Sequence, residues 1–180
     1  MCIIMGMKRE IKTERLTLSP LGPEFLHSTH AYASDAENAR YMMFMPVDSL
    51  DETRAWLEDC AAEWAKPHPI DMEFAILLDG RHIGGVGVDY LERKDAAELG
   101  WVLHPAYHGH GYATEAARAV IDFAVKRFGA NHFIAHCDGE NAASQSVMRK
   151  LGMTLTNDRG ERKNRASDAP RVEYTYELHL

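Results

Sequence analysis

The chain has 180 residues, 46% of them hydrophobic and 26% charged, which suits one globular domain with a core and excludes a mainly disordered chain. Its formal net charge of -7 argues against nucleic acid as a partner, because duplex-binding modules carry a basic surplus. Three widely spaced cysteines indicate a reducing compartment rather than a disulfide framework. No stretch approaches the roughly 18 apolar residues of a membrane span, so we expect a cytoplasmic protein with no membrane partner.

The N-terminal region predicts a leader followed by a strand and a helix. We place the leader at residues 1–12 and a single domain at 13–180. The apolar run of the leader is too short for a signal-peptide core, and its positive charges follow the run. Arg15 to Ser19 alternate apolar and polar residues and predict a strand. Pro23 to Ala33 predict a short helix with proline near its first turn.

An antiparallel meander is predicted in the middle of the chain. Ser49 and Glu52 match a capping box, and the helix that they begin ends near Lys66, before two prolines. Period-2 patterns and tight-turn residues then predict three strands in succession. These strands are Glu73 to Leu78, Arg81 to Leu91 and Ala96 to Leu103, joined by turns at Asp79-Gly80 and at Arg93 to Asp95.

The C-terminal half alternates helices and strands. Apolar residues at helical spacing predict a helix from Tyr112 to Phe128, and a second helix runs from Asn141 to Leu151 with Asn141 as N-cap. His132 to Cys137 is a short buried strand, and Asn157 to Pro170 is a polar loop between two further strands, the second of which is Val172 to Leu178. The fold class is therefore α/β, with a mixed, largely antiparallel sheet of about seven strands flanked by about four helices. This order differs from the regular alternation of a doubly wound fold.

A glycine-containing turn carries the strongest signal for a ligand. The predicted strand that ends at Leu103 is followed by Pro105, then by Gly109 and Gly111, and a helix begins immediately. The N-terminus of a helix binds phosphates, and glycine lets the main chain approach them closely. The turn is neither a Walker A loop nor a GxGxxG fingerprint, since Thr114 stands where the third glycine would be. On local physics alone, an ordinary tight turn explains the glycines equally well.

Two blocks resemble the GNAT superfamily of N-acetyltransferases, and within it the branch of ribosomal-protein N-terminal acetyltransferases. The first block is Glu98-Leu99-Gly100-Trp101, Pro105 and Gly109-His110-Gly111-Tyr112-Ala113-Thr114-Glu115-Ala116. The second is Glu140-Asn141-x-x-Ser144…Val147…Lys150-Leu151-Gly152-Met153, and the opening Thr13-Glu14-Arg15-Leu16 also resembles the first strand of the branch. The resemblance extends from about residue 13 to the end of the chain.

The resemblance implies a single-domain GNAT-like fold and transfer of an acetyl group from acetyl-CoA to a primary amine by direct nucleophilic attack. The acceptor is a small-molecule amine or a protein N-terminus, and the residues do not decide between them. A homodimer is a family-level expectation. A non-catalytic acyl-CoA-binding or regulatory module is the alternative from another functional class.

Two residues are candidates for catalysis on the same resemblance. Glu98 is the candidate general base, acting through water on an ammonium whose pKa is near 10.4, and its alternatives are a substrate-orienting residue or an exposed strand residue. Ser144 is the candidate for protonating the leaving thiolate or for contacting the CoA arm. Tyr112 is an alternative phenolic donor that is as readily explained by packing.

The resemblance also implies a set of residues that contact acetyl-CoA. These residues are Trp101, Val102, Leu103, His108, Gly109, His110, Gly111, Tyr112, Ala113, Thr114, Asn141 and Ser144. For Trp101 to Leu103 we expect contact through the main chain, including one N–H that polarises the thioester carbonyl, while the side chains pack.

Three histidines in this region allow a different interpretation, a metal site. His104, His108 and His110 form a His-x3-His-x-His pattern that would suit zinc, but they flank a proline and lack a carboxylate partner. We therefore predict no metal site. At the positions of His108 and His110 the family often carries other residues, including basic ones. Histidine is only partly charged near neutral pH, so we expect the attraction of phosphate to this turn to depend more on pH.

Overall fold

The computed structural model describes residues 10–91 and 96–180 as one mixed sheet with helices on both faces. Most of the predicted leader and the predicted turn at Arg93 to Asp95 lie outside the described residues. The strands are β1 (Ile11–Lys12), β2 (Leu16–Pro20), β3 (Asp71–Leu78), β4 (Arg81–Leu91), β5 (Ala96–Leu103), β6 (His132–Asp138), β7 (Thr154–Arg162) and β8 (Arg171–His179). The helices are α1 (Leu26–Ala33), α2 (Leu50–Ala65), α3 (Tyr112–Phe128) and α4 (Ala142–Lys150), with short 3-10 turns at Pro23–Phe25 and Pro105–Tyr107.

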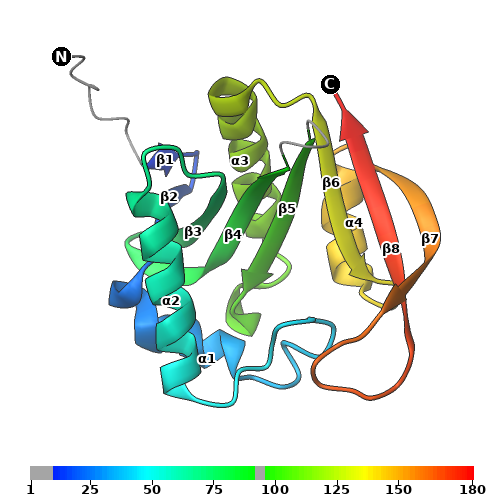
Figure 1. Cartoon of the computed structure of the whole chain (residues 1–180), viewed down its shortest axis with the longest axis horizontal. Helices are drawn as coiled ribbons and strands as arrows, with labels where there is room; N and C mark the ends of the chain where they lie inside the picture. The colour runs from blue at the N-terminus through cyan, green and yellow to red at the C-terminus, as the bar shows by residue number, and fades with distance from the viewer. Residues whose placement is uncertain (1–9, 92–95) are drawn as a thin grey trace.

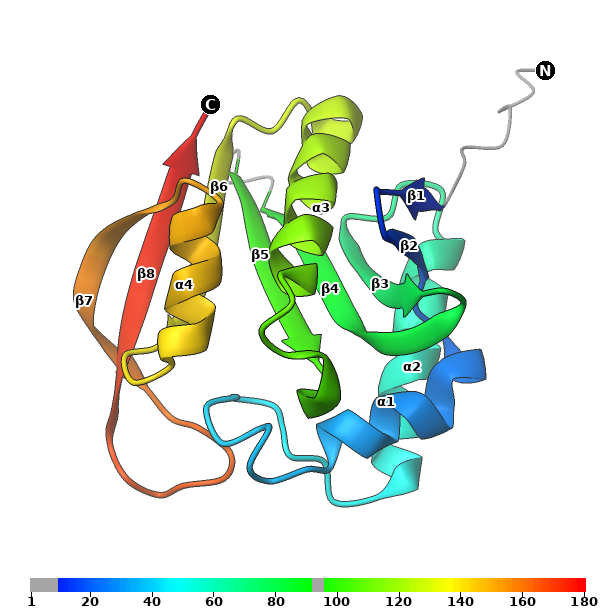
Figure 2. The ribbon, with the colours of Figure 1, turned by 180° about the vertical axis from the view of Figure 1, so that it is seen from behind.

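The strand order in the sheet is β1-β2-β3-β4-β5-β6-β8-β7. Every neighbouring pair is antiparallel except β5 and β6, which are parallel and are connected through α3. Figure 1 shows α1 and α2 on one face of the sheet, and Figure 2, turned by 180°, shows α3 and α4 on the other. The predicted α/β class with a mixed, largely antiparallel sheet is therefore confirmed.

The described part of the sheet has eight strands rather than about seven. The additional strand is β1, whose two residues we had assigned to the leader and which pairs with Leu18 and Thr17 of β2. The prediction of a loop over Asn157 to Pro170 was wrong for its first part, because β7 continues to Arg162. Since β7 is an edge strand exposed along most of its length, its polar residues give no hydrophobic alternation to detect.

Local signals begin and end the elements much as predicted. The Ser49 hydroxyl accepts a hydrogen bond from the Glu52 N–H at 3.1 Å, whereas the Glu52 carboxylate accepts from the N–H of Asp48 rather than Ser49. Asp79 and Gly80 have φ values of 49° and 77°, as a type I′ hairpin turn requires. Both ends of α2 and the β3–β4 connection therefore follow from residues close in sequence.

A one-residue irregularity shifts the pairing of β3 and β4. Leu77 pairs with His82, but Ile76 pairs with Gly84, so one extra residue of β4 stands between the two pairs. Beyond that point Glu73 lies opposite Gly87, whereas continuous hairpin pairing would place it opposite Val86. The irregularity therefore decides which residues of β4 share a face with those of β3.

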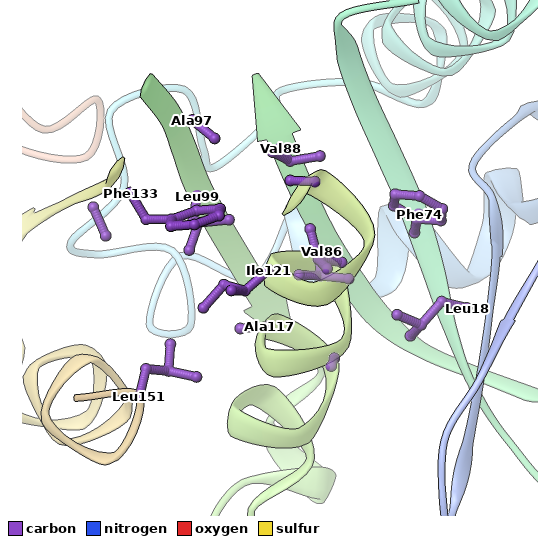
Figure 3. Close-up of a cluster of buried hydrophobic side chains, with 14 of the residues drawn as sticks. Leu18, Phe74, Val86, Val88, Ala97, Leu99, Ala117, Ile121, Phe133 and Leu151 are labelled. Atoms are coloured by element: carbon purple, nitrogen blue, oxygen red, sulfur yellow. The ribbon is translucent and has the colours of Figure 1, made fainter. Parts of the chain in front are cut away.

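The main core lies between α3 and the sheet, as Figure 3 shows. Small residues of α3, Ala117 among them, let the helix approach side chains of β3, β4 and β5 closely. The central members of this main core include Leu18, Phe74, Val86, Leu99, Ile121 and Phe133. A smaller cluster around Leu57 and Ala75 fills the opposite face under α2. Apolar packing thus covers β4 and β5 from the side of α3, whereas the cluster under α2 covers β3.

Gly84 of β4 tests how closely the central strands approach each other. A Cβ at this position would lie 2.8 Å from the Leu103 Cα, which is main chain that cannot move aside cheaply. We expect Gly84→Ala to lower the free energy of unfolding by about 1–3 kcal/mol, measured by urea denaturation. Gly100→Ala is the matched control, because a Cβ there would meet nothing within 4 Å. Equal destabilisation of both variants would contradict the packing described for β4.

Candidate functional site

The parallel strands β5 and β6 diverge after a short paired segment. Only Ala97 to Leu99 pair with β6, at Phe133 to Ala135. The next four residues of β5, Gly100–Leu103, keep their pairing with β4 but have no partner in β6. Figure 1 shows the two strands separating toward their C-terminal ends. The main chain of Gly100–Leu103 can therefore pair with another extended molecule on its β6 side.

The turn after β5 presents backbone N–H groups at the N-terminus of α3. Gly109 and Gly111 both have φ of +81°, a conformation that side-chain-bearing residues rarely adopt. Gly111 is the N-cap of α3 and supplies no side-chain cap, and the first helical hydrogen bond joins the Glu115 N–H to the Gly111 C=O at 3.0 Å. The earlier N–H groups at this helix end are thus available to an anion.

A network between α3 and the β1–β2 connection holds this turn in place. Glu115 accepts hydrogen bonds from the Thr13 hydroxyl at 2.6 Å and from the Arg15 N–H at 2.9 Å. Partial burial opposes ionisation of Glu115, but the hydrogen bonds from Thr13 and Arg15 outweigh it and lower the pKa of this carboxyl. Arg15 also donates to the His110 C=O at 3.1 Å. We had not identified Arg15 as a site residue, although it lies within the Thr13–Leu16 motif.

The three histidines of the turn each make a local contact. The His108 ring lies 3.1 Å from the Leu103 C=O, so this side chain points back toward the end of β5. The His110 ring stacks on Tyr112 with a centroid separation of 5.6 Å, and the His104 ring accepts a hydrogen bond from a main-chain N–H at 3.2 Å. One ring nitrogen of His108 is therefore engaged at the end of β5.

A different group of side chains has the spacing of metal ligands. Among the described residues, the three ligand atoms that gather within 4.8 Å belong to His132, Glu177 and His179, on β6 and β8. The His132 Nε2 atom lies 2.7 Å from the Glu177 carboxylate. The histidines of the turn do not form such a group.

The side chains of Trp101, Val102 and Leu103 pack against the protein. Leu103 is buried in the main core and Trp101 is partly buried against it. Val102 packs on the opposite face, against a cluster around Tyr32. The expectation that these three side chains pack is therefore met.

The first turn of α4 follows directly after β6. Asn141 is the N-cap of α4, and its side chain accepts a hydrogen bond from the Ser144 N–H at 3.0 Å, as predicted. Ser144 is half-buried, and its hydroxyl donates to none of the described residues. Because β5 and β6 are parallel, α3 and α4 both begin beyond the diverging strand ends. The two sequence blocks are thus brought to the same edge of the sheet.

The sheet face beneath α1 and α2 carries three cross-strand rows on β3, β4 and β5. One row is acidic, one is mostly glycine and one is small or apolar. The rows are Asp71–Asp89–Glu98, Glu73–Gly87–Gly100 and Ala75–Gly85–Val102. Burial, with the neighbouring carboxylates second, raises the pKa of Asp71 and of Asp89. Glu98, the predicted catalytic residue, is thus half-buried at one end of an acidic row.

Two loops meet beside these rows. The loop after α1 and the loop between β7 and β8 lie side by side in Figures 1 and 2. Arg165 donates its main-chain N–H to the Met42 C=O at 3.1 Å, and its guanidinium pairs with Asp48 at 2.6 Å and with Glu52. Asp138, at the end of β6, is almost fully buried and anchors the second loop.

The Asp138 carboxylate accepts two hydrogen bonds from Arg171 at 2.7 Å and one from Asn164 at 2.6 Å. Burial of this carboxyl opposes ionisation, but the hydrogen bonds from Arg171, the Glu140 N–H and Asn164, with the charge of Arg171, together outweigh burial and lower the pKa. We had not identified this group, because its members are far apart in the sequence. Within residues 10–91 and 96–180, none of the helices is long and apolar enough to span a membrane.

Comparisons with known proteins agree with this geometry. Residues 15–154 match the family model described as an acetyltransferase (GNAT) domain. The N-acetyltransferase YnaD of Bacillus subtilis, itself uncharacterised, is 30% identical over 143 residues, which span 79% of this chain and 81% of that protein. The spermidine N(1)-acetyltransferase of Escherichia coli is 26% identical over 141 residues, 77% of this chain and 72% of that protein.

Among solved structures, the ribosomal L7/L12 α-N-protein acetyltransferase RimL, in complex with coenzyme A, superposes with a TM-score of 0.82. It is 17% identical, and the match covers 95% of this chain and 98% of RimL, so it supports the fold. The family model covers most of the chain and the sequence relatives are acetyltransferases over the same region. The chain therefore belongs to the GNAT family of acetyltransferases.

Proposed function

We propose that this GNAT acetyltransferase uses the diverging ends of β5 and β6 to hold acetyl-CoA and acetylates a cationic primary amine from the face beneath α1 and α2. One observation carries the proposal: the β5 segment without a β6 partner lies between the phosphate-binding turn and the acidic row. The turn and the acidic row thus lie at the two ends of one unpaired strand segment.

The residues present fit acetyl-CoA. Its role is to supply an acetyl thioester, and the chain's role is to bind and orient it. The free N–H groups from Gly109 to Thr114 would hold the pyrophosphate, with the positive charge of Arg15 close by. The main chain of Trp101, Val102 and Leu103 would pair with the pantetheine arm. His108 and Asn141 would contribute through their main chains, since their side chains are already hydrogen-bonded.

The acceptor side favours a positively charged amine. Asp71, Asp89 and Glu98 place three carboxyl groups in register across β3, β4 and β5. Like charges directly opposite one another destabilise a sheet, and an ammonium in the row would relieve that repulsion. The relatives act on amines of two kinds by name, spermidine and a protein N-terminus, so both classes remain candidates for this chain.

Ser144 is proposed to serve the leaving group. Its half-buried hydroxyl lies in the first turn of α4, beyond the diverging end of β6. From there it can donate to the thiolate or contact the CoA arm. The cytoplasmic location and the homodimer stay predictions.

The first prediction concerns the turn. Gly111→Trp is expected to raise the dissociation constant for acetyl-CoA at least about tenfold, because the indole would fill the phosphate position. Isothermal titration calorimetry measures this constant. Gly129→Trp is the matched control, since Gly129 lies at the other end of α3 with φ of +72° and meets nothing within 4 Å. Loss of binding in both variants would point to damage to α3 rather than to a cofactor site.

The second prediction concerns Glu98. Glu98→Gln is expected to lower kcat/KM for a cationic amine by about 10²-fold or more, because it removes a carboxylate from the acceptor side. Acetyl-CoA binding should be unchanged. Steady-state assays of thiol release measure the rate over a panel of 1,4-diaminobutane, spermidine and a serine-initiated peptide.

Glu161→Gln is the matched control for Glu98→Gln, because Glu161 is an exposed strand residue on β7. Acetyl-CoA binding without any turnover across the panel would favour the non-catalytic module instead.

A further inference from the structure

Glu73 of β3 directs its carboxyl group across β4. A Cβ built on Gly87 would lie 2.6 Å from the Glu73 Cδ and 2.8 Å from one of its oxygens. The carboxyl group thus occupies the space above Gly87, one strand away from its own main chain. A side chain at position 87 would exclude it, so glycine at this position is what allows the carboxyl group to reach over β4.

The surface beyond this carboxyl group is bare. Gly87 pairs with Gly100 of β5, so Glu73 and both glycines form one row on the same face. Gly100 is exposed, and a Cβ there would meet nothing within 4 Å. It is also the first residue of β5 beyond the pairing with β6. No side chain of the row therefore stands between the Glu73 carboxyl group and the point where β5 and β6 diverge.

The surroundings of Glu73 are short of positive charge. The carboxyl group is half-buried and forms no ion pair with the described residues. Titratable groups on the surrounding elements are Asp71 on its own strand, Asp89 and His82 on β4, Glu98 on β5, Tyr32 on α1, and Cys60 and Glu63 on α2. Burial, with a smaller contribution from Asp71, raises the pKa of Glu73 to about 8.

A buried hydroxyl group next to this row lacks a partner. The Tyr32 side chain is 1% exposed, and its hydroxyl makes no hydrogen bond with the described residues. It lies 3.6 Å from the Cβ position of Gly85, the next residue of β4 on the same face as Gly87. A buried polar group without a partner is uncommon and calls for a ligand or an ordered water. The Tyr32 hydroxyl lies at the neighbouring row, Ala75–Gly85–Val102, and so adds a second polar group on the same face of the sheet.

We propose that Glu73 is the general base that accepts the proton of the acceptor ammonium, while Glu98 and its acidic row hold the acceptor in place. This inference rests on the proposed function. The ammonium loses one proton to Glu73, and the freed nitrogen lone pair forms the C–N bond. The C–S bond breaks with its electron pair on sulfur, and the thiolate takes the second nitrogen proton. Glu73 then releases its proton to solvent.

Acid strength favours this role. Proton transfer from an ammonium with pKa near 10.4 to a carboxylate of pKa about 8 is unfavourable by about 10²-fold. Transfer to an ordinary glutamate with pKa near 4.3 is unfavourable by about 10⁶-fold. A general base works best when its pKa is close to the working pH, and Glu73 meets that condition.

The first test is the pH dependence of kcat/KM with 1,4-diaminobutane. In the wild type it should fall tenfold per pH unit below about pH 8, because protonated Glu73 cannot accept a proton. Glu73→Gln should lose this ionisation and lower kcat by about 10²-fold or more, with the acetyl-CoA dissociation constant unchanged. Glu98→Gln should keep the ionisation and raise KM, and Glu161→Gln should match the wild type.

A second variant keeps the carboxyl group but moves it. The three atoms nearest to a Cβ at position 87 all belong to the flexible end of the Glu73 side chain, so Gly87→Ala would displace this end and the protein should fold. We expect a kcat at least about tenfold lower, which is the loss from misplacing a catalytic group by about an ångström or less. An unchanged kcat in this variant would overturn the proposal.

Protein stability gives a readout that needs no acceptor. The pKa of Glu73 in the folded chain, about 8, is above its ordinary value, so the folded state binds this proton more tightly. The contribution of Glu73 to stability is therefore lost as the pH rises from about 4.5 to about 8. We therefore expect the Tm of Glu73→Gln to rise relative to the Tm of the wild type as the pH increases from 5 to 8.5.

The outcomes separate the two proposals. No acetyl-CoA binding by the folded wild type would remove the proposed function and this inference with it. If Glu73→Gln keeps both its kcat and the ionisation near pH 8 while Glu98→Gln loses them, only the inference is overturned. The general base is then Glu98. A Tm difference that does not change with pH would also overturn it.

Discussion

The single parallel strand pair in this sheet is the constraint on which the rest of the site depends. Parallel strands require a crossover, and here α3 provides it between β5 and β6. The crossover brings the N-terminus of α3 back to the C-terminal end of β5. Because β6 is parallel to β5, α4 begins at the same end. The pairing then stops after Leu99, so two helix N-termini surround a length of strand with an unpaired side.

The opposite face combines features that destabilise a sheet but suit catalysis. Asp71, Asp89 and Glu98 are like charges in register, and glycines in the next row contribute no packing. Burial of Glu73 without a counter-ion raises its pKa toward neutral pH. The core between α3 and the sheet offsets these effects, because it packs β4 and β5 tightly from the other side. Stability and chemistry are thus assigned to opposite faces of the same strands.

The two loops beside the proposed acceptor face are joined to the sheet by charged groups rather than by apolar packing. Arg165 ties the loop before β8 to the loop before α2, and Asp138 ties it to the end of β6. Asp138 is buried and its bonds are short, whereas the Arg165 contacts are more exposed and more easily screened by salt. The loop before β8 therefore has one firm attachment at the end of β6 and a weaker one at the start of α2.

The sequence by itself determined most of the elements, the glycine turn before α3 and the N-cap at Asn141, because these depend on neighbouring residues. It did not reveal β1 or the full length of β7, since short and edge strands lack a buried alternation. Glu73 escaped notice for a different reason. Only the extra residue in β4 places it opposite Gly87, and only the β4–β5 pairing places Gly87 beside Gly100. The position of a carboxyl group over a bare strand is a property of register between distant segments, which only the tertiary structure decided.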